Sequence, residues 1–254
     1  MIAIISPAKT LDFKSNTQTT KNSQPDFLND SKILINELRN YNPKDISQLM
    51  SVNNQIASLN FERFLSWRTP FNIDNAKQAL LAFRGQVYVG LDAKTLTEQD
   101  LLFAQDHLRI LSGLYGILRP LDLIQAYRLE MGISLKNSKG KNLYEFWDTR
   151  ITEVINNELK NHKRNVLINL ASNEYFKAIK SKLIKGDIIT PVFKESKGND
   201  FKVVTVYAKT ARGLMSRFII QNRIDNPEDL KTFEIGGYLY NQDLSTEKQW
   251  VFTR

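Results

Sequence analysis

Short runs of large apolar residues alternate with helix-like patterns along this chain, and this alternation constrains the fold more than any other feature. Ile2–Ile5, Val166–Leu170 and residues 188–193 are apolar runs bounded by polar residues or prolines, as buried strands are. Between them, apolar residues recur at helical spacing, and Thr97 with Asp100 resembles a capping box. Because strands and helices interleave without a linker or repeat, we predict a single mixed α/β (α+β) domain over residues 1–254.

Further elements are predicted from the same patterns. They are strands over residues 86–89, 201–207 and 249–252, and helices over residues 43–49, 74–83, 98–112, 142–159 and 210–221. The polar segment 194–200 separates two of the predicted strands, and its length suits a hairpin.

The composition excludes several kinds of chemistry. The 254 residues include no Cys and only two His, so disulfides, thiolate metal sites, cysteine nucleophiles and three-histidine sites are impossible. His107 and His162 lie far apart in the sequence without ligand-spaced neighbours, so each is expected to be structural, and no metal or cofactor is predicted. No apolar stretch is long enough to cross a bilayer, and the N-terminus lacks signal-peptide features. We therefore expect a soluble cytoplasmic protein without membrane contact.

The charge balance points to an anionic partner. Thirty-five Lys and Arg against 27 Asp and Glu give a net charge of +8. Such an excess is compatible with binding to nucleic acid but does not require it, because net charge affects solubility and the steering of charged partners and does not determine the fold.

Two closely spaced glycines form the first candidate motif. Gly113 and Gly116 lie between apolar stretches, and glycines in such a corner can expose backbone amides that bind an anion. One interpretation is a helix-hairpin-helix in which these amides grip a DNA phosphate beside Arg119. The other is a glycine-terminated helix followed by a tight turn. Pro120 fits only the first turn of a second helix, so that helix would have to be short.

Lys9 and the pair of Arg128 and Glu130 are the next candidates. Lys9 comes just after the first strand, where α/β proteins bind ligands, although an ordinary surface turn is the more common explanation. Arg128 and Glu130 are two residues apart, so on a strand they would share a face, whereas a core salt bridge is the simpler interpretation.

A second charged group opens the helix after residues 166–170. Glu174 could act as a general base with Tyr175 or Lys177 as its partner, while a surface ion pair between Glu174 and Lys177 is the alternative. Lys209, Arg212 and Arg217 form the densest basic element, which suits either phosphate binding or a solvated helix face.

Taken together, these motifs resemble the YaaA peroxide stress protein family. The similar blocks run along almost the whole chain and comprise residues 6–11, 111–122, 127–132, 143–144 with 146–147, 169–172 with 174–175, and 209 with 211–213. The resemblance implies a bacterial cytosolic protein that protects against peroxide by limiting free intracellular iron. It also implies a curved mixed sheet wrapped by helices, a positively charged cleft, and a helix-hairpin-helix element that binds duplex or distorted DNA.

Two hypotheses of function remain open. The first is a monomeric DNA-binding stress protein whose phosphate contacts are Gly113, Gly116, Arg119, Lys209, Arg212 and Arg217. The second is an enzyme acting on a small anionic, nucleotide-like or nucleobase-like substrate, with catalytic candidates Glu174, Lys9 and Glu130 and pocket residues Arg128, Tyr175 and Lys177. Convergence of these charges in one pocket would favour the enzyme, whereas a spread along an open groove would favour DNA.

Overall fold

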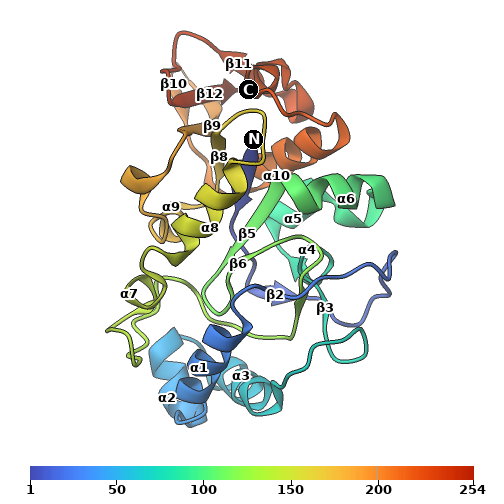
Figure 1. Ribbon diagram of the computed structural model, residues 1–254. Coiled ribbons are helices and arrows are strands. Elements are labelled where there is room, and N and C mark those ends of the chain that lie inside the picture. Colours follow the sequence, from blue (N-terminus) through green and yellow to red (C-terminus); the bar gives the residue numbers. More distant parts are fainter. Residues whose placement is uncertain (199) are drawn as a thin grey trace.

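A computed structural model describes residues 1–198 and 200–254 of the protein (Figure 1). The strands are β1 (Ile2–Ile5), β2 (Thr10–Leu11), β3 (Lys77–Gln78), β4 (Phe83–Arg84), β5 (Leu108–Ser112), β6 (Gly116–Leu118), β7 (Leu123–Ile124), β8 (Val166–Leu170), β9 (Asp187–Lys197), β10 (Asp200–Lys202), β11 (Leu239–Asn241) and β12 (Gln249–Thr253). The α-helices are α1 (Leu28–Leu38), α2 (Pro43–Met50), α3 (Asn54–Ser66), α4 (Ala79–Ala82), α5 (Gln86–Leu91), α6 (Glu98–His107), α7 (Leu143–Trp147), α8 (Arg150–Leu159), α9 (Asn173–Phe176) and α10 (Thr205–Gln221). Short 3₁₀ helices cover Ala93–Thr95, Ser181–Leu183, Pro227–Thr232 and Ile235–Gly237.

An eight-stranded mixed sheet forms the centre of the molecule, as the predicted α/β class requires. Its order is β11-β12-β9-β8-β1-β5-β6, with β10 paired to β9. β1 is parallel to both of its neighbours, with Ile5 opposite Ile110 of β5 and Leu170 of β8. β9 and β12 continue the parallel part, whereas β6, β10 and β11 are antiparallel to their partners. The parallel strands therefore end at one common edge of the sheet.

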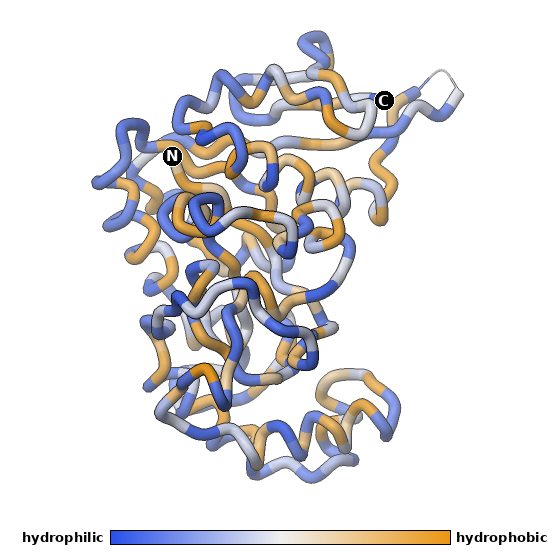
Figure 2. The backbone as a smooth tube through the Cα atoms, turned by 90° about the vertical axis from the view of Figure 1, so that its right-hand side faces the viewer, coloured by the Kyte–Doolittle hydropathy of each residue, from blue (hydrophilic) through white to orange (hydrophobic). Residues whose placement is uncertain are grey.

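Burial of β1 on both faces explains why its sequence is continuously apolar. Ile2, Ile4 and Ile5 are fully buried, and the tube leading from the N-terminus is hydrophobic in Figure 2. Central strands of a parallel sheet are covered on both sides, so their sequences do not alternate between apolar and polar residues.

The three helices α1, α2 and α3 lie at the lower end of the molecule, away from the sheet (Figure 1). In Figure 2 the tube at this end alternates between hydrophobic and hydrophilic residues, as amphipathic helices do. α2 begins where the Asn42-Pro43 sequence predicts it. Asn42 accepts hydrogen bonds from the amides of Lys44 and Asp45, and Asp45 accepts one from the amide of Asn42. The capping box predicted for Thr97 and Asp100 is also present at the start of α6.

Residues 86–89 form the start of α5, not the predicted strand. The Val and Tyr content of this run favours a strand, but packing against α10 decides the outcome. A Cβ on Gly213 of α10 would lie 1.9 Å from the carbonyl oxygen of Val87, and one on Gly90 of α5 would lie 2.1 Å from that of Thr210. Two reciprocal glycines thus bring the two helix backbones into direct contact (Figure 1).

Three predicted helices are wrong in extent. Residues 74–83 contain β3 and α4 in place of one helix, and β3 pairs with β7. The helix predicted over residues 98–112 ends at His107, and the chain continues as β5 because that segment pairs with β1. The helix predicted over residues 142–159 is divided into α7 and α8 at Asp148, whose φ of 42° is incompatible with a continuous helix.

The predicted strand over residues 201–207 is also divided. β10 ends at Lys202, and α10 begins at Thr205, five residues before the predicted start at Thr210. The predicted hairpin is confirmed, since β9 and β10 pair antiparallel. Asn199, within the polar segment of that hairpin, lies outside the described residues.

The helix-hairpin-helix predicted around Gly113 and Gly116 is not confirmed. Strands β5 and β6 flank the two glycines and pair antiparallel, with Ser112 opposite Gly116. The intervening Leu114 and Tyr115 are fully buried. The apolar residues on either side therefore belong to core strands, and the glycines turn the chain between them. None of the described helices is both long and apolar enough to cross a bilayer.

Replacing Gly213 with Ala is expected to destabilise the protein strongly. The added methyl group has no room beside the Val87 carbonyl, so α5 and α10 must separate at a cost of about 3 kcal/mol in unfolding free energy. Gly198→Ala is the matched control: its φ is +67°, but apart from its chain neighbours no atom of the described residues lies within 4 Å of the added Cβ, so only about 1 kcal/mol of backbone strain is expected. Urea denaturation measures both, and equal losses would contradict the helix contact.

Candidate functional site

A cavity of about 620 Å³ opens at the carboxyl ends of β1 and β8. Helices α5 and α10 contribute to its walls, so their glycine contact sets the spacing of those walls. Ligand sites of α/β proteins occur at this edge of the sheet, where neighbouring chain connections diverge. The lining residues are Ser6–Thr10, Gly85–Tyr88, Tyr127–Glu130, Ser172–Tyr175, Val203, Thr205, Ala208, Lys209 and Arg212.

Hydrogen bonds join the strand ends that border the cavity. The Ser172 amide donates to Ser6 Oγ at 2.9 Å, and Ser6 Oγ donates to Ser172 Oγ at 3.2 Å. Tyr88 Oη donates to the Ser6 carbonyl oxygen at 3.1 Å and so ties α5 to the end of β1. These contacts hold three walls of the cavity in a fixed relation.

Two cations share one carboxylate oxygen of Glu130. Lys9 Nζ lies 3.1 Å from Glu130 Oε1, and Arg128 Nε and Nη2 donate to the same oxygen at 3.2 and 3.0 Å. The Arg128 and Glu130 side chains are only 15% and 13% exposed, whereas Lys9 is 66% exposed. The salt bridge considered for Arg128 and Glu130 is therefore present, and it forms part of the cavity wall.

Two buried polar atoms of the cavity wall have no hydrogen-bond partner among the described residues. They are Glu130 Oε2, an acceptor, and Arg212 Nε, a donor. Burial lowers the pKa of Arg212. Leaving a buried polar group unpaired costs about 1–3 kcal/mol, so native proteins pair nearly all of them. Glu130 and Arg212 both line the cavity, and each therefore carries one polar atom that no described residue satisfies.

Glu174 is held at the cavity by its neighbours. Its Oε1 accepts a hydrogen bond from the Gly132 amide at 3.0 Å, and its carbonyl oxygen accepts one from Tyr144 Oη at 3.0 Å. The ion pair considered between Glu174 and Lys177 is replaced by another contact, since Lys177 Nζ lies 5.1 Å from the centroid of the Tyr144 ring. Lys177 is not among the described residues that line the cavity.

Three tyrosines supply aromatic surface to the cavity. Tyr88, Tyr127 and Tyr175 are buried, and burial raises the pKa of each phenol well above its ordinary value, so all three are neutral. Tyr127 Oη and Ser112 Oγ share a hydrogen bond of 2.6 Å. The sequence singled out Tyr175 but not Tyr88, because residues 86–89 resemble a strand. Tyr127 was also missed as a cavity residue, although it lies in one of the blocks that resemble the YaaA family.

Several residues predicted to bind phosphate lie elsewhere and have internal partners. Arg119 pairs with Asp122 and Asp26 at 3.1 and 3.2 Å. Arg217 Nη1 donates to the carbonyl oxygens of Leu91 and Asp92, where it closes the end of α5.

The double-glycine corner is occupied by protein. The Gly113 carbonyl oxygen accepts a hydrogen bond from Trp147 Nε1 at 2.9 Å, and a Cβ on Gly116 would lie 2.8 Å from the Trp147 ring. The other predicted site residues except Lys177, in contrast, come together in the cavity at the ends of β1 and β8. They are Lys9, Arg128, Glu130, Glu174, Tyr175, Lys209 and Arg212.

Comparison with known proteins assigns the chain to a family. A family model described as peroxide stress protein YaaA matches residues 1–244. This chain belongs to the YaaA peroxide stress protein family.

Relatives of the chain carry the family designation UPF0246. A UPF0246 protein of Cellvibrio japonicus is 52% identical over 254 residues, which are 100% of this chain and 98% of that protein. One from Aliivibrio fischeri strain MJ11 is 53% identical over 100% of this chain and 98% of that protein. One from Colwellia psychrerythraea is 51% identical over 100% of this chain and 99% of that protein. The residues that the family model matches include every residue that lines the cavity, from Ser6 to Arg212.

We expect the coupling free energy between Glu130 and Arg128 to exceed that between Glu130 and Lys9. In double-mutant cycles, Glu130→Gln and Arg128→Gln should be coupled by about 1–3 kcal/mol, because both partners are largely shielded from water. Glu130→Gln and Lys9→Gln should be coupled by about 0.5 kcal/mol, because Lys9 is mostly solvated. Urea unfolding of the single and double variants measures both couplings. A stronger coupling with Lys9 would refute this description of the wall.

Proposed function

We propose that this YaaA family member binds a small anionic ligand of the nucleotide or nucleobase class in the cavity at the ends of β1 and β8 and acts on it by proton transfer. The observation that carries the proposal is the pair of unpartnered buried atoms, Glu130 Oε2 and Arg212 Nε. A nucleotide presents both complements, because its phosphate oxygens accept hydrogen bonds and its base or ribose donates them.

The size and lining of the cavity support a small ligand over a duplex. A volume of about 620 Å³ lies within the roughly 300–1,000 Å³ range of small-molecule sites. Tyr88, Tyr127 and Tyr175 add aromatic surface suited to a planar ring. Lys9, Lys209 and Arg212 provide positive charge for an anionic group.

Proton transfer is the chemistry that the carboxylates support. Glu130 keeps one oxygen free while the other is fixed by Lys9 and Arg128, and Glu174 is fixed by the Gly132 amide. A positioned carboxylate can accept a proton from a bound ligand, and Lys9 can return one to it. In this proposal, Glu130 and Glu174 are the candidate bases and Lys9 the candidate acid.

Arg212→Gln is expected to weaken ligand binding by about 10- to 100-fold, since a hydrogen bond to a charged group contributes about 1.5–3 kcal/mol. The probes are AMP, GMP, CMP and UMP, measured by calorimetric titration and by the shift in thermal midpoint. Lys44→Gln is the matched control, because it removes the same charge from an exposed site on α2, outside the cavity wall. No binding of any of the four probes, or equal weakening in both variants, would overturn the nucleotide assignment.

The catalytic part of the proposal has a separate test in cells. Glu174→Gln should lose protection against peroxide while the purified variant keeps its unfolding midpoint and its affinity for the nucleotide probe. The side-chain oxygen of Gln can still accept the hydrogen bond from the Gly132 amide, so the local geometry is kept and only proton transfer is removed. Normal peroxide survival with Glu174→Gln and with Glu130→Gln would exclude both proposed bases.

A second candidate is binding of duplex or distorted DNA, favoured by the net charge of +8 and by the exposed Lys9 and Lys209 at the cavity. If about two phosphates are neutralised there, log K should fall against log salt with a slope of about −2, and Lys209→Gln should reduce the slope by about 1. Fluorescence anisotropy with duplex and bulged DNA measures the slope. Arg119→Gln is the comparison, because Arg119 already has internal carboxylate partners.

A further inference from the structure

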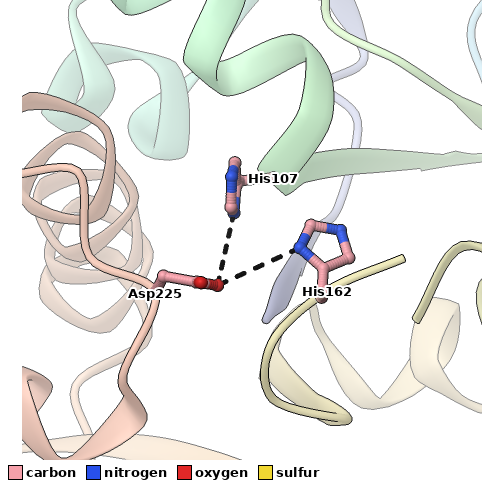
Figure 3. Close-up of side chains that lie close together, drawn as sticks. All are labelled: His107, His162 and Asp225. Atoms are coloured by element: carbon pink, nitrogen blue, oxygen red, sulfur yellow. Dashed lines mark ion pairs between the residues drawn. The ribbon is translucent and has the colours of Figure 1, made fainter. Parts of the chain in front are cut away.

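The two histidines of the chain meet at the opposite end of β1 from the cavity. His107 is the last residue of α6, His162 lies between α8 and β8, and Asp225 follows α10. One potential ligand atom from each of these three residues lies within 4.8 Å of the other two. Figure 3 shows the three side chains converging on a common space from three separate segments. Sequence spacing gave no sign of this, because the three residues are distant along the chain.

The distances describe an open cluster and not a closed hydrogen-bonded one. His107 Nδ1 and His162 Nδ1 each lie 4.0 Å from Asp225 Oδ1 (Figure 3). Such separations are too long for hydrogen bonds. Burial lowers the pKa of His107 and lowers that of His162 to about 4, so both rings are neutral near pH 7 and gain little from a nearby carboxylate as ion pairs. The two imidazoles therefore make no hydrogen bond to the carboxylate, whose Oδ1 accepts one from the α-amino group of Met1 instead.

We infer that His107, His162 and Asp225 form a binding site for a divalent first-row transition metal ion. Two imidazole nitrogens and one carboxylate oxygen are a ligand set that such ions take, with further positions left for water or another ligand. Metal–ligand distances of about 2.0–2.2 Å place neighbouring ligand atoms about 3 Å apart, so closing on an ion requires shifts of about 1 Å.

The surroundings fix the imidazoles and keep them accessible. The Phe103 ring stacks on His107 with centroids 4.0 Å apart and an interplanar angle of 9°, and the two imidazoles meet edge to face at 4.7 Å. The His107, His162 and Asp225 side chains are 15%, 10% and 27% exposed, so an ion can reach them. The preference is for borderline ions over Mg²⁺ or Ca²⁺, which take oxygen ligands.

Two existing contacts compete with the ion and shape the experiment. His107 Nδ1 lies 3.1 Å from the Met1 carbonyl oxygen, so an ion bound to this nitrogen replaces the proton that it donates there. The α-amino group of Met1 donates to Asp225 Oδ1 at 2.9 Å. The protein should therefore be produced without an N-terminal extension and without a polyhistidine tag, and it should be freed of metal with a chelator.

The test is titration of the metal-free protein with Co²⁺, followed by its visible absorption, and with Zn²⁺, followed by calorimetry. One equivalent of each ion should bind, and Mg²⁺ at the same concentration should not. His162→Gln and Asp225→Asn should each weaken binding by roughly 100-fold or more, because loss of even a supporting contact to a metal ligand costs about 10- to 100-fold. Asp187→Asn, at an exposed carboxylate outside the cluster, is the matched control and should bind normally.

Folding of the variants is checked by their urea unfolding midpoints in the absence of metal. If one histidine variant does not fold, Asp225→Asn and His107→Gln carry the test. Zn²⁺ should raise the thermal midpoint of the unchanged protein but not that of a folded variant. Absence of one-equivalent binding, or binding that survives both Asp225→Asn and His162→Gln, would overturn the site.

Discussion

The parallel pairing of β1 with β5 and β8 is the constraint on which the rest of the structure depends. This four-residue strand spans about 13 Å and is buried on both faces. Its carboxyl end delivers Ser6 and Lys9 to the cavity, and its amino end lies against Asp225 and the two histidines. Because β1 pairs on both sides, neither end can shift without breaking backbone hydrogen bonds to a neighbour. The two candidate sites are thus held at fixed, opposite ends of one strand.

The cavity concentrates charge that a simple surface clamp would not require. Glu130 holds two cations on one oxygen and leaves its second oxygen free, while Arg212 is buried with its Nε unpaired among the described residues. Each unpaired buried atom is unfavourable in isolation, and proteins tolerate such groups chiefly where function uses them. The family model that matches the chain is described as peroxide stress protein YaaA, and the cavity supplies a chemical hypothesis for a member of that family.

Two arginines that were predicted to bind DNA phosphates have partners within the protein instead. Arg119 and Arg217 are used internally, one with carboxylates and the other with the carbonyl end of α5. The double-glycine corner is filled by Trp147 and buried leucine and tyrosine side chains. Of the predicted phosphate contacts, Lys209 and Arg212 line the cavity, and Lys209 is exposed there together with Lys9. A charge total alone could not distinguish these cases, because it contains no information about which cations already have partners.

The sequence alone predicted the mixed α/β class, the strands β1 and β8, and the helix starts at Pro43 and after Thr97. These features could be predicted because continuous apolar runs and capping residues act on neighbours only a few positions away. The same reasoning identified Lys9 and Glu174, which follow strand ends, and Glu130, whose spacing from Arg128 would place both side chains on one face of a strand. It could not find the helix at residues 86–91, whose formation depends on Gly213 more than a hundred positions away. Nor could it bring His107, His162 and Asp225 together. Contacts between residues so distant along the chain exist only once the sheet has fixed the paths of the intervening segments, and that is a property of the folded backbone.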